Sequence, residues 1–287
     1  MFEGLPSFTA FYVALARGVA THEAALSRAC QDPVAQQLLP TPLRLLVQRA
    51  AASPTTARAL RYSQLGMFDH HAMRTALVDQ ALHDALARGA RQLVLLGAGL
   101  DTRGHRLPAL SNTIVFEIDH PLTQGYKQRR ANLLQRGARE IRYATCDFER
   151  DRFADVLHDA GFDPTQPSCV IWEGVTMYLQ EPAVERALDT LSHLCCSGST
   201  LITTYLWQVP TTDVSWGTLR SILQAVAEPL RFDSSTEAMA DRLKKHGFDV
   251  LADALPITRA DDFGVSPLPF PAAAPAERER VVVAERM

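Results

Sequence analysis

The chain has 287 residues, of which 47% are hydrophobic, and a formal net charge of −3 at pH 7. This length and apolar content suffice for one large α/β domain or two small ones. The small net charge, without blocks of like charge, argues against a nucleic-acid-binding surface. The sequence shows no run of transmembrane length, no secretory-signal pattern and no C-x-x-C pair among its five cysteines. We therefore expect a cytoplasmic protein without disulfides, a metal site, or membrane or nucleic-acid partners.

The first 90 residues show helical rather than strand patterns. Apolar residues recur at three- and four-residue spacing in four segments, 8–18, 23–30, 41–52 and 69–89. In the last segment Asp69 can cap the start of the helix, and Gly89 suits the position just after its end. The pattern predicts an N-terminal helical cap over residues 1–90.

Seven short runs rich in Val, Ile, Leu and Phe predict strands, and helical segments alternate with the first five. The strands are expected at 93–96, 114–118, 141–145, 169–172, 201–206, 248–252 and 281–284. The alternation predicts a doubly wound, mostly parallel α/β sheet, with the last two strands as a hairpin. We expect a cofactor-binding α/β core at 91–206, a lid or substrate insertion at 207–232, and a C-terminal helix with the last two strands at 233–287. A capping box at 234–237 would begin that helix.

The loop Gly97-Ala98-Gly99 follows the first strand, and Asp119 ends the second. The glycines allow a tight turn close to a ligand, and an acid about 20 residues further on can bind a ribose hydroxyl. A dinucleotide fingerprint would need a third glycine at Thr102, and the lysine of a phosphate-binding P-loop is absent as well. A nucleoside ligand without a pyrophosphate fits better, with S-adenosylmethionine as the candidate.

Acidic residues follow three predicted strands at their carboxyl ends: Asp119, Asp147 and Glu173. Ligands of open parallel sheets bind beyond these ends, so the three acids can face one crevice. Alternatively, each acid merely caps the helix that follows it. Arg74, taken by itself, reads as a solvated charge.

Three longer motifs carry a resemblance to a known family. They are L-G-A-G-L-D-T-R at 96–103, E-I-D-H-P at 117–121 and E-G-V-T-M-Y-L at 173–179, supported by A-G-F-D-P at 160–164. Over residues 7–206 the chain resembles the leucine carboxyl methyltransferase family, in its bacterial small-molecule O-methyltransferase branch. The resemblance implies the seven-stranded Rossmann-like fold of class I S-adenosylmethionine-dependent methyltransferases, with S-adenosylhomocysteine as a product.

The resemblance also implies roles for individual residues. The expected cofactor contacts are Arg74 at the methionine carboxylate, Gly97 under the methionyl part, Asp119 at the ribose, Asp147 and Phe148 around adenine, and Glu173 near the methionine amino group. Ala98 and Gly99 of the glycine loop are expected to bind the cofactor as well. Aromatic residues in and near the insertion, Tyr178, Tyr205 and Trp207, are expected to contact an apolar small-molecule substrate.

The expected reaction is O-methylation of a carboxylate on a small molecule, for example a polyketide-type acid, to a methyl ester. A carboxylic acid is already ionised at neutral pH and needs no general base. No His–Asp or His–Glu pair in the sequence has to serve as a base, and His105 and His120 near the glycine loop read as structural, so no catalytic residue is named. The alternatives are a hydroxyl O-methyltransferase, a protein C-terminal carboxyl methyltransferase and a non-catalytic cofactor-binding regulator. A dehydrogenase is disfavoured by the missing third glycine, and the oligomeric state stays open.

Overall fold

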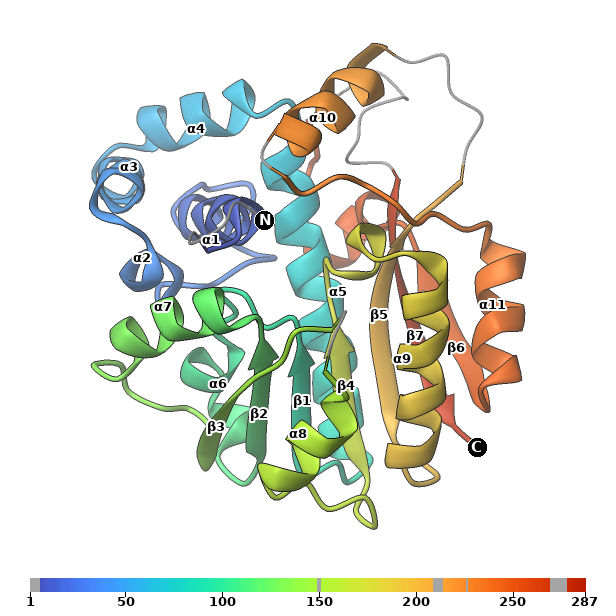
Figure 1. The fold of residues 1–287 in the computed structure, drawn as a ribbon. Helices are drawn as coiled ribbons and strands as arrows, with labels where there is room; N and C mark the ends of the chain where they lie inside the picture. Colours follow the sequence, from blue (N-terminus) through green and yellow to red (C-terminus); the bar gives the residue numbers. More distant parts are fainter. Residues whose placement is uncertain (1–5, 149–150, 209–213, 226, 269–277) are drawn as a thin grey trace.

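A computed structural model describes residues 6–148, 151–208, 214–225, 227–268 and 278–287. Its centre is a twisted sheet with helices on both faces and a group of helices above one end (Figure 1). The strands are β1 (Gln92–Leu96), β2 (Ile114–Asp119), β3 (Glu140–Thr145), β4 (Ser168–Trp172), β5 (Thr200–Leu206), β6 (Phe248–Ala254) and β7 (Glu279–Arg286). Each predicted strand lies within one of these, so all seven predictions are confirmed.

The strand order is β3-β2-β1-β4-β5-β7-β6, and only the pairings of β7 with β5 and β6 are antiparallel. The predicted doubly wound, mostly parallel sheet with a final hairpin is therefore confirmed. Strand order reverses between β1 and β4. From β1 the chain adds β2 and β3 on one side, and from β4 it adds the remaining strands on the other side. A crevice at this switch point is where open α/β sheets bind ligands.

The described helices are α1 (Phe8–Ala20), α2 (Ala35–Leu38), α3 (Thr41–Ala52), α4 (Pro54–Ser63), α5 (Met67–Ala87), α6 (Arg103–Arg106), α7 (Pro121–Ala131), α8 (Phe153–Asp159), α9 (Glu181–Leu194), α10 (Val214–Ala225) and α11 (Thr236–Lys245). Short 3₁₀ segments cover Pro108–Leu110, Thr176–Tyr178 and Pro256–Phe263. None of the described helices is long and apolar enough to cross a membrane.

Alternate residues of the strands face two apolar layers, because side chains of a strand point to opposite faces. Val94 and Leu96 pack with α8, α9 and α11, whereas Leu93 and Leu95 pack with α5. Helix α5 thus covers one face of the sheet, although it lies in the predicted cap at 1–90. The division into segments stays a prediction, with α5 as the helix that joins cap and core.

The helical region differs from the prediction in two places. Residues 23–30 form turns, because the buried Glu23 carboxylate accepts the backbone N–H groups of Ala25 and Leu26 and competes with helical bonding. Helix α4 was not predicted, since Pro54 reads as a break. In the structure Pro54 occupies the first helical position, where its missing N–H costs nothing, and Ser53 caps the helix by accepting the N–H of Thr56.

Two predicted helix caps are also wrong. Helix α5 begins two residues earlier than expected, after Gly66 at φ +85°. Asp69 is fully buried and pairs with Arg61 at 2.6 Å rather than capping the helix. At α11 the cap is Ser235, whose hydroxyl accepts the N–H of Ala238, while the predicted Ser234 is buried one residue earlier.

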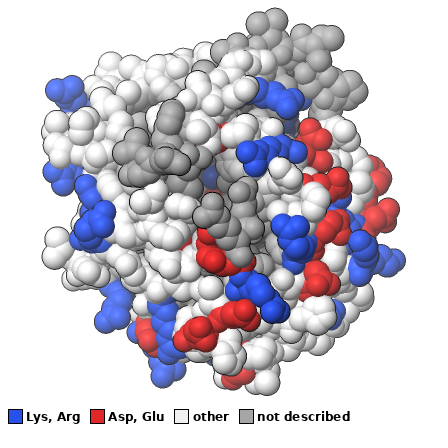
Figure 2. All heavy atoms as spheres, viewed as in Figure 1, with Lys and Arg blue, Asp and Glu red and all other residues white. Residues whose placement is uncertain are grey.

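The surface carries mixed charge. On the face in Figure 2, acidic and basic side chains are interspersed over α9 and α11. There Arg242 pairs with Glu181 and Glu185, and Lys245 pairs with Glu185. A nucleic-acid interface would show a one-sided basic field, which this face lacks.

Candidate functional site

A cavity of about 730 Å³ lies beyond the carboxyl ends of β1, β2 and β4. Helix α1, the first half of α5, the segment from Leu223 to Arg231 and the start of β7 complete its lining. All eight predicted cofactor residues line it: Arg74, Gly97, Ala98, Gly99, Asp119, Asp147, Phe148 and Glu173. Residues from five separate stretches of sequence thus meet at one edge of the sheet.

The glycine loop is held in a conformation that suits only glycine. Gly97 and Gly99 have φ of +68° and +49°, and a Cβ on Gly97 would lie 2.4 Å from the Val175 side chain. The amides of Gly97 and Ala98 donate to the carbonyl of Ile118 at 2.8 and 3.0 Å. The loop therefore returns to the end of β2 and presents its backbone to the cavity.

Asp119 receives backbone hydrogen bonds on both carboxylate oxygens. Oδ2 accepts the N–H of Gly99, and Oδ1 accepts the N–H of His120 at 2.6 Å. Burial raises the pKa of Asp119 above its ordinary value, although these two N–H donors oppose the shift. Each oxygen keeps a second lone pair, so the fixed carboxylate can still accept hydroxyl donors from a sugar.

Asp147 and Phe148 follow β3 at the far side of the glycine loop. The N–H of Asp147 donates to the Asp151 carboxylate at 2.8 Å. The Phe148 ring lies 6.1 Å from that of Phe153 and forms part of the cavity lining. An apolar ring next to an acceptor side chain suits a flat heterocycle that carries an amino group.

A set of charged residues that we call the ion-pair wall consists of His70, Arg74, Glu173 and Glu279. Arg74 donates from Nε to Glu173 at 2.8 Å and from Nη1 to both oxygens of Glu279 at 2.8 and 2.7 Å. His70 Nε2 lies 2.7 Å from Glu279 Oε2. The wall lines the cavity. Its residues come from α5, from β7 and from the position just after β4.

Electrostatics keep the wall's carboxylates ionised. Burial alone would raise the pKa of Glu173, but the guanidinium groups of Arg103 and Arg74 outweigh it and lower that pKa. The pKa of Glu279 is likewise lowered, because Arg74 and the hydrogen bond from His70 outweigh its burial. The wall thus presents carboxylates and a guanidinium, which suit an ammonium and a carboxylate on one ligand.

The comparisons with known proteins agree with this geometry. A family model described as leucine carboxyl methyltransferase matches residues 10–192. The chain belongs to the leucine carboxyl methyltransferase family. The predicted membership in the class I S-adenosylmethionine-dependent methyltransferases, with S-adenosylmethionine as the cofactor, is therefore confirmed.

Relatives support the same assignment. A Mycolicibacterium gilvum protein, provisionally named an S-adenosyl-L-methionine-dependent methyltransferase, is 34% identical over 251 residues, covering 84% of this chain and 76% of the relative. A Mycobacterium tuberculosis H37Rv protein with the same provisional name is 31% identical over 245 residues, covering 83% and 66%. The matched stretch thus spans just under two thirds of that relative.

Solved structures support the fold. The chain resembles a Thermobifida fusca protein, provisionally described as a methyltransferase, with a TM-score of 0.60 at 16% identity, covering 99% of this chain and 96% of the other. A second match is a DUF574 family protein of Streptomyces avermitilis, with a TM-score of 0.55 at 14% identity, covering 80% and 89%. At these identities the likeness confirms the Rossmann-like fold alone.

Residues of the family's L-G-A-G-L-D-T-R stretch also bond to side chains that hold the cavity residues in place. Sequence reasoning missed these contacts. Arg103 donates to Asp79 at 2.7 Å and to Glu173 at 2.8 Å. Thr102 donates to the fully buried Asp32 at 2.6 Å. Asp32 in turn holds Arg17, a cavity residue, at 2.8 Å. The motif thus fixes Glu173 and ties the α1 region to the glycine loop.

Other cavity residues were also missed, namely Asp101, His70, His71 and Glu279. Asp101 could have been noted as the Asp of L-G-A-G-L-D-T-R. Burial and the nearby Arg74 lower the pKa of His71 well below its usual value, so this ring is neutral. For Glu279, which lies 205 residues from its partner Arg74, no local sequence signal exists.

The three predicted substrate residues are not brought together. Tyr178 lines the cavity, and burial raises the pKa of its hydroxyl, which stays protonated at neutral pH. Tyr205 is fully buried and donates to Asp253 at 2.6 Å, and Trp207 pairs with Ser234 and lies against Arg280. Neither is among the described residues that line the cavity, because Tyr205 packs into an apolar core layer and Trp207 packs against Arg280 of β7.

His105 and His120 differ in their placement. His105 lies outside the cavity lining, between the Gln135 carbonyl at 3.0 Å and the Tyr143 hydroxyl at 3.1 Å, which agrees with a structural role. His120 lines the cavity, but its Nδ1 accepts the N–H of Leu122 and caps α7. His70 and Glu279 form a histidine–carboxylate pair that the sequence did not reveal.

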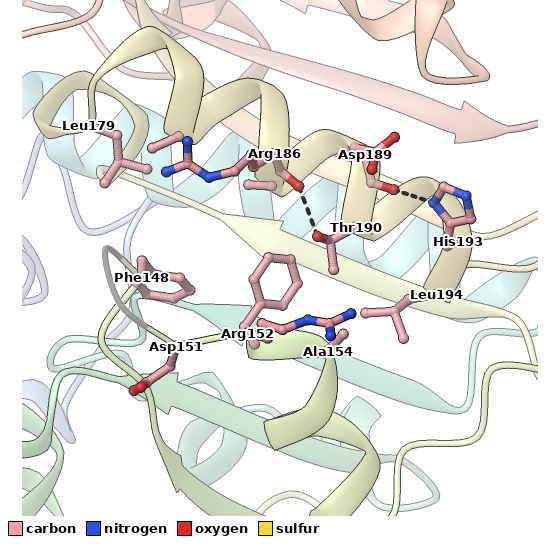
Figure 3. A pocket seen from close by; sticks show the side chains of 13 residues that line it. Phe148, Asp151, Arg152, Ala154, Leu179, Arg186, Asp189, Thr190, His193 and Leu194 are labelled. Atoms are coloured by element: carbon pink, nitrogen blue, oxygen red, sulfur yellow. Dashed lines mark hydrogen bonds between the residues drawn. The ribbon is translucent and has the colours of Figure 1, made fainter.

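A second hollow, a groove of about 520 Å³, lies between α8 and α9 (Figure 3). Two of its polar side chains bond within α9: Thr190 donates to the carbonyl of Arg186 at 2.8 Å, and His193 Nδ1 contacts that of Asp189 at 2.7 Å. Phe148 and Leu179 line both the groove and the cavity. The groove thus adjoins the cavity at Phe148, a residue that is predicted to contact adenine.

Proposed function

We propose that this protein transfers a methyl group from S-adenosylmethionine to a carboxylate of a small, largely apolar molecule and forms a methyl ester. The observation that carries the proposal is one cavity whose lining combines charged and apolar side chains. Arg74, Asp119 and Glu173 are among the charged ones. The apolar part of the lining includes Met177, Leu206, Leu223, Pro229 and Leu230.

The predicted cofactor residues fit the groups of S-adenosylmethionine. Glu173 offers a carboxylate to the methionine ammonium, Arg74 a guanidinium to the methionine carboxylate, and Asp119 acceptors to the ribose hydroxyls. Gly97, Ala98 and Gly99 leave room beneath the methionyl chain, and Asp147 with Phe148 would bound the adenine. Because Glu279 also engages Arg74, we propose that it helps to orient this guanidinium toward the methionine carboxylate.

When bound, S-adenosylmethionine supplies a methyl group that is already activated on a sulfonium. The residues of the chain then have to hold the acceptor and the methyl group in line and exclude water. Such positioning can lower the activation barrier by about 7–11 kcal/mol. An ionised carboxylate needs no base. Tyr178, whose hydroxyl stays protonated, is proposed to contact the acceptor. The segment 207–232, of which residues 209–213 and 226 lie outside the described part, is proposed as the lid.

The test is turnover of methyl-labelled S-adenosylmethionine with apolar carboxylic acids such as 2-naphthoic acid. We expect a product that releases labelled methanol in mild alkali, because esters hydrolyse and methyl ethers do not. The rate should stay flat above about pH 6, since the carboxylate is ionised throughout that range. Products that are all stable to alkali would contradict the ester. Cofactor binding without any turnover would favour a non-catalytic regulator.

A further inference from the structure

The cavity contains a histidine–carboxylate pair that ester formation does not need. His70 lies on α5 and Glu279 at the start of β7, with 2.7 Å between Nε2 and Oε2. His70 is only 1% exposed, and both residues line the cavity. A carboxylate acceptor arrives ionised, so its methylation leaves this pair without a chemical task.

The pair fixes which ring nitrogen of His70 carries hydrogen. Glu279 is an ionised acceptor, because Arg74 and His70 lower its pKa despite burial. Nε2 of His70 must therefore donate, and in a neutral ring Nδ1 is left as a bare acceptor. Nδ1 is buried and has no hydrogen-bond partner within the described ranges of the chain. Since buried polar atoms are rarely left unbonded, this nitrogen calls for a donor from a ligand.

His70 lines the cavity next to the residues that are predicted to hold the methionine part of the cofactor. The contacts run in series from Glu173 through Arg74 and Glu279 to His70, each between 2.7 and 2.8 Å. On α5, His70 precedes Arg74 by four residues, which is about one helical turn. The start of α5 rises past the ends of the strands toward α10 (Figure 1). The start of α5, which carries His70, thus lies at the end of the sheet where the cavity is formed.

We propose that this cavity also methylates a hydroxyl group, a phenol or an alcohol, with His70 as the general base. In this step Nδ1 of His70 takes the hydroxyl proton while the oxygen forms a bond to the methyl carbon. The carbon–sulfur bond breaks with its electron pair going to sulfur, which yields a methyl ether and S-adenosylhomocysteine. His70 then releases its proton to solvent. Glu279 is a positioning residue, which fixes the tautomer and stabilises the imidazolium.

The inference rests on the proposed function only for the cofactor and the cavity, and the two can fail separately. The experiment offers wild-type protein two probes of nearly one shape, 2-naphthol and 2-naphthoic acid, with methyl-labelled S-adenosylmethionine. We expect an alkali-stable ether from the first and a labile ester from the second. Ester without ether overturns the inference and leaves the proposed function intact. Ether without ester does the reverse.

Variants assign the proton transfer. His70→Gln keeps a polar side chain of similar length but has no basic nitrogen, so the ratio of ether to ester formation should fall about 10²–10⁴-fold. Glu279→Gln should lower kcat for 2-naphthol while its KM stays within about threefold, since its effect is on the base rather than on acceptor binding. The control is His83→Gln on the exposed face of α5, which should leave both rates unchanged. An unchanged ratio in His70→Gln overturns the inference.

A binding measurement is independent of turnover. With S-adenosylhomocysteine present, bound 4-nitrophenol should show the visible band of its phenolate in wild type and His83→Gln. In His70→Gln the band should disappear while S-adenosylhomocysteine still binds, which also shows that the variant is folded. If His70→Gln does not fold, Glu279→Gln should show a weakened band. An undiminished phenolate band in His70→Gln, or in Glu279→Gln where His70→Gln does not fold, overturns the inference, as does the absence of the band from wild type.

Discussion

Two regions of the same cavity are built in opposite ways. The glycine loop with Asp119 is local: Gly97, Ala98 and Gly99 turn back onto the end of the neighbouring strand through backbone hydrogen bonds. The ion-pair wall of His70, Arg74, Glu173 and Glu279 is assembled from α5, the end of β4 and β7 through side chains alone. The loop therefore depends on backbone conformation, and the wall on long-range charge pairing.

The two regions also titrate in opposite directions. For Asp119, burial outweighs the opposing effects of its two N–H donors and of Lys127, and its pKa is raised. Glu173 bonds to Arg103 and Arg74, and Glu279 bonds to Arg74, and these guanidinium groups lower the pKa of both carboxylates despite burial. The direction of the pKa shift thus depends on whether a guanidinium bonds directly to the carboxylate. Four predictions exploit this difference.

The largest effect is expected from breaking the wall. Arg74→Ala leaves two buried carboxylates without their shared cation, and the loss of one partner of a buried pair costs about 3–5 kcal/mol of unfolding free energy. Denaturant unfolding measures the loss. Arg88→Ala is the control near the end of the same helix, since Arg88 and Glu285 are both about 40% exposed, and an exposed pair is worth about 0–1 kcal/mol. Equal losses in the two variants would show that the wall's charges are solvated.

Gly97→Ala should break the loop by sterics. The new Cβ would meet Val175 at 2.4 Å and force a non-glycine residue to φ +68°, which together cost about 2–4 kcal/mol. Gly89→Ala is the matched control, because Gly89 also has a positive φ but a Cβ added there would meet no atom within 4 Å. The double change Gly97→Ala with Val175→Ala should recover the steric part. If it recovers nothing, backbone strain is the whole effect.

Asp119→Ala should weaken the cofactor rather than the fold. It removes a charged acceptor for the ribose, worth about 1.5–3 kcal/mol, so calorimetry should show about 10- to 150-fold weaker binding of S-adenosylhomocysteine. Asp84→Ala, an exposed acid on α5, should leave the affinity unchanged. An Asp119→Ala affinity within twofold of wild type would remove Asp119 from the proposed cofactor site.

The smallest effect is the pH dependence of stability. The folded pKa of Glu279 is lowered, so its stabilisation is present above the ordinary value of about 4.3 and is lost as the pH falls below it. Glu279→Gln should therefore flatten the acid side of the stability curve. The folded pKa of Asp119 is raised, so its ionisation destabilises the fold as the pH rises from about 3.9. Asp119→Asn should remove that decline. An acid side that is unchanged in Glu279→Gln, or a decline that persists in Asp119→Asn, would contradict the direction assigned to the pKa shift of that residue.

The sequence predicted most of the fold and much of the loop region. The strands could be predicted because a buried parallel sheet needs short, uninterrupted apolar runs. The loop could be predicted because Gly97 and Gly99 indicate a turn and Asp119 lies at the end of a strand. The errors in the helical region came from side-chain and proline effects on the local backbone, which the spacing of apolar residues does not reveal. The Glu23 carboxylate binds backbone N–H groups, and Pro54 begins a helix that it was expected to interrupt.

The wall was predicted only in part: Glu173 through its place at the end of a predicted strand, and Arg74 only through the family resemblance. Their bond at 2.8 Å, the joint hold of Glu279 on Arg74 and His70, and the removal of Tyr205 from the cavity were decided by the tertiary structure. The physical reason is distance along the chain. Apolar spacing and glycine turns report the conformation of neighbouring residues, whereas a buried charge finds its partner only after helices and strands have packed.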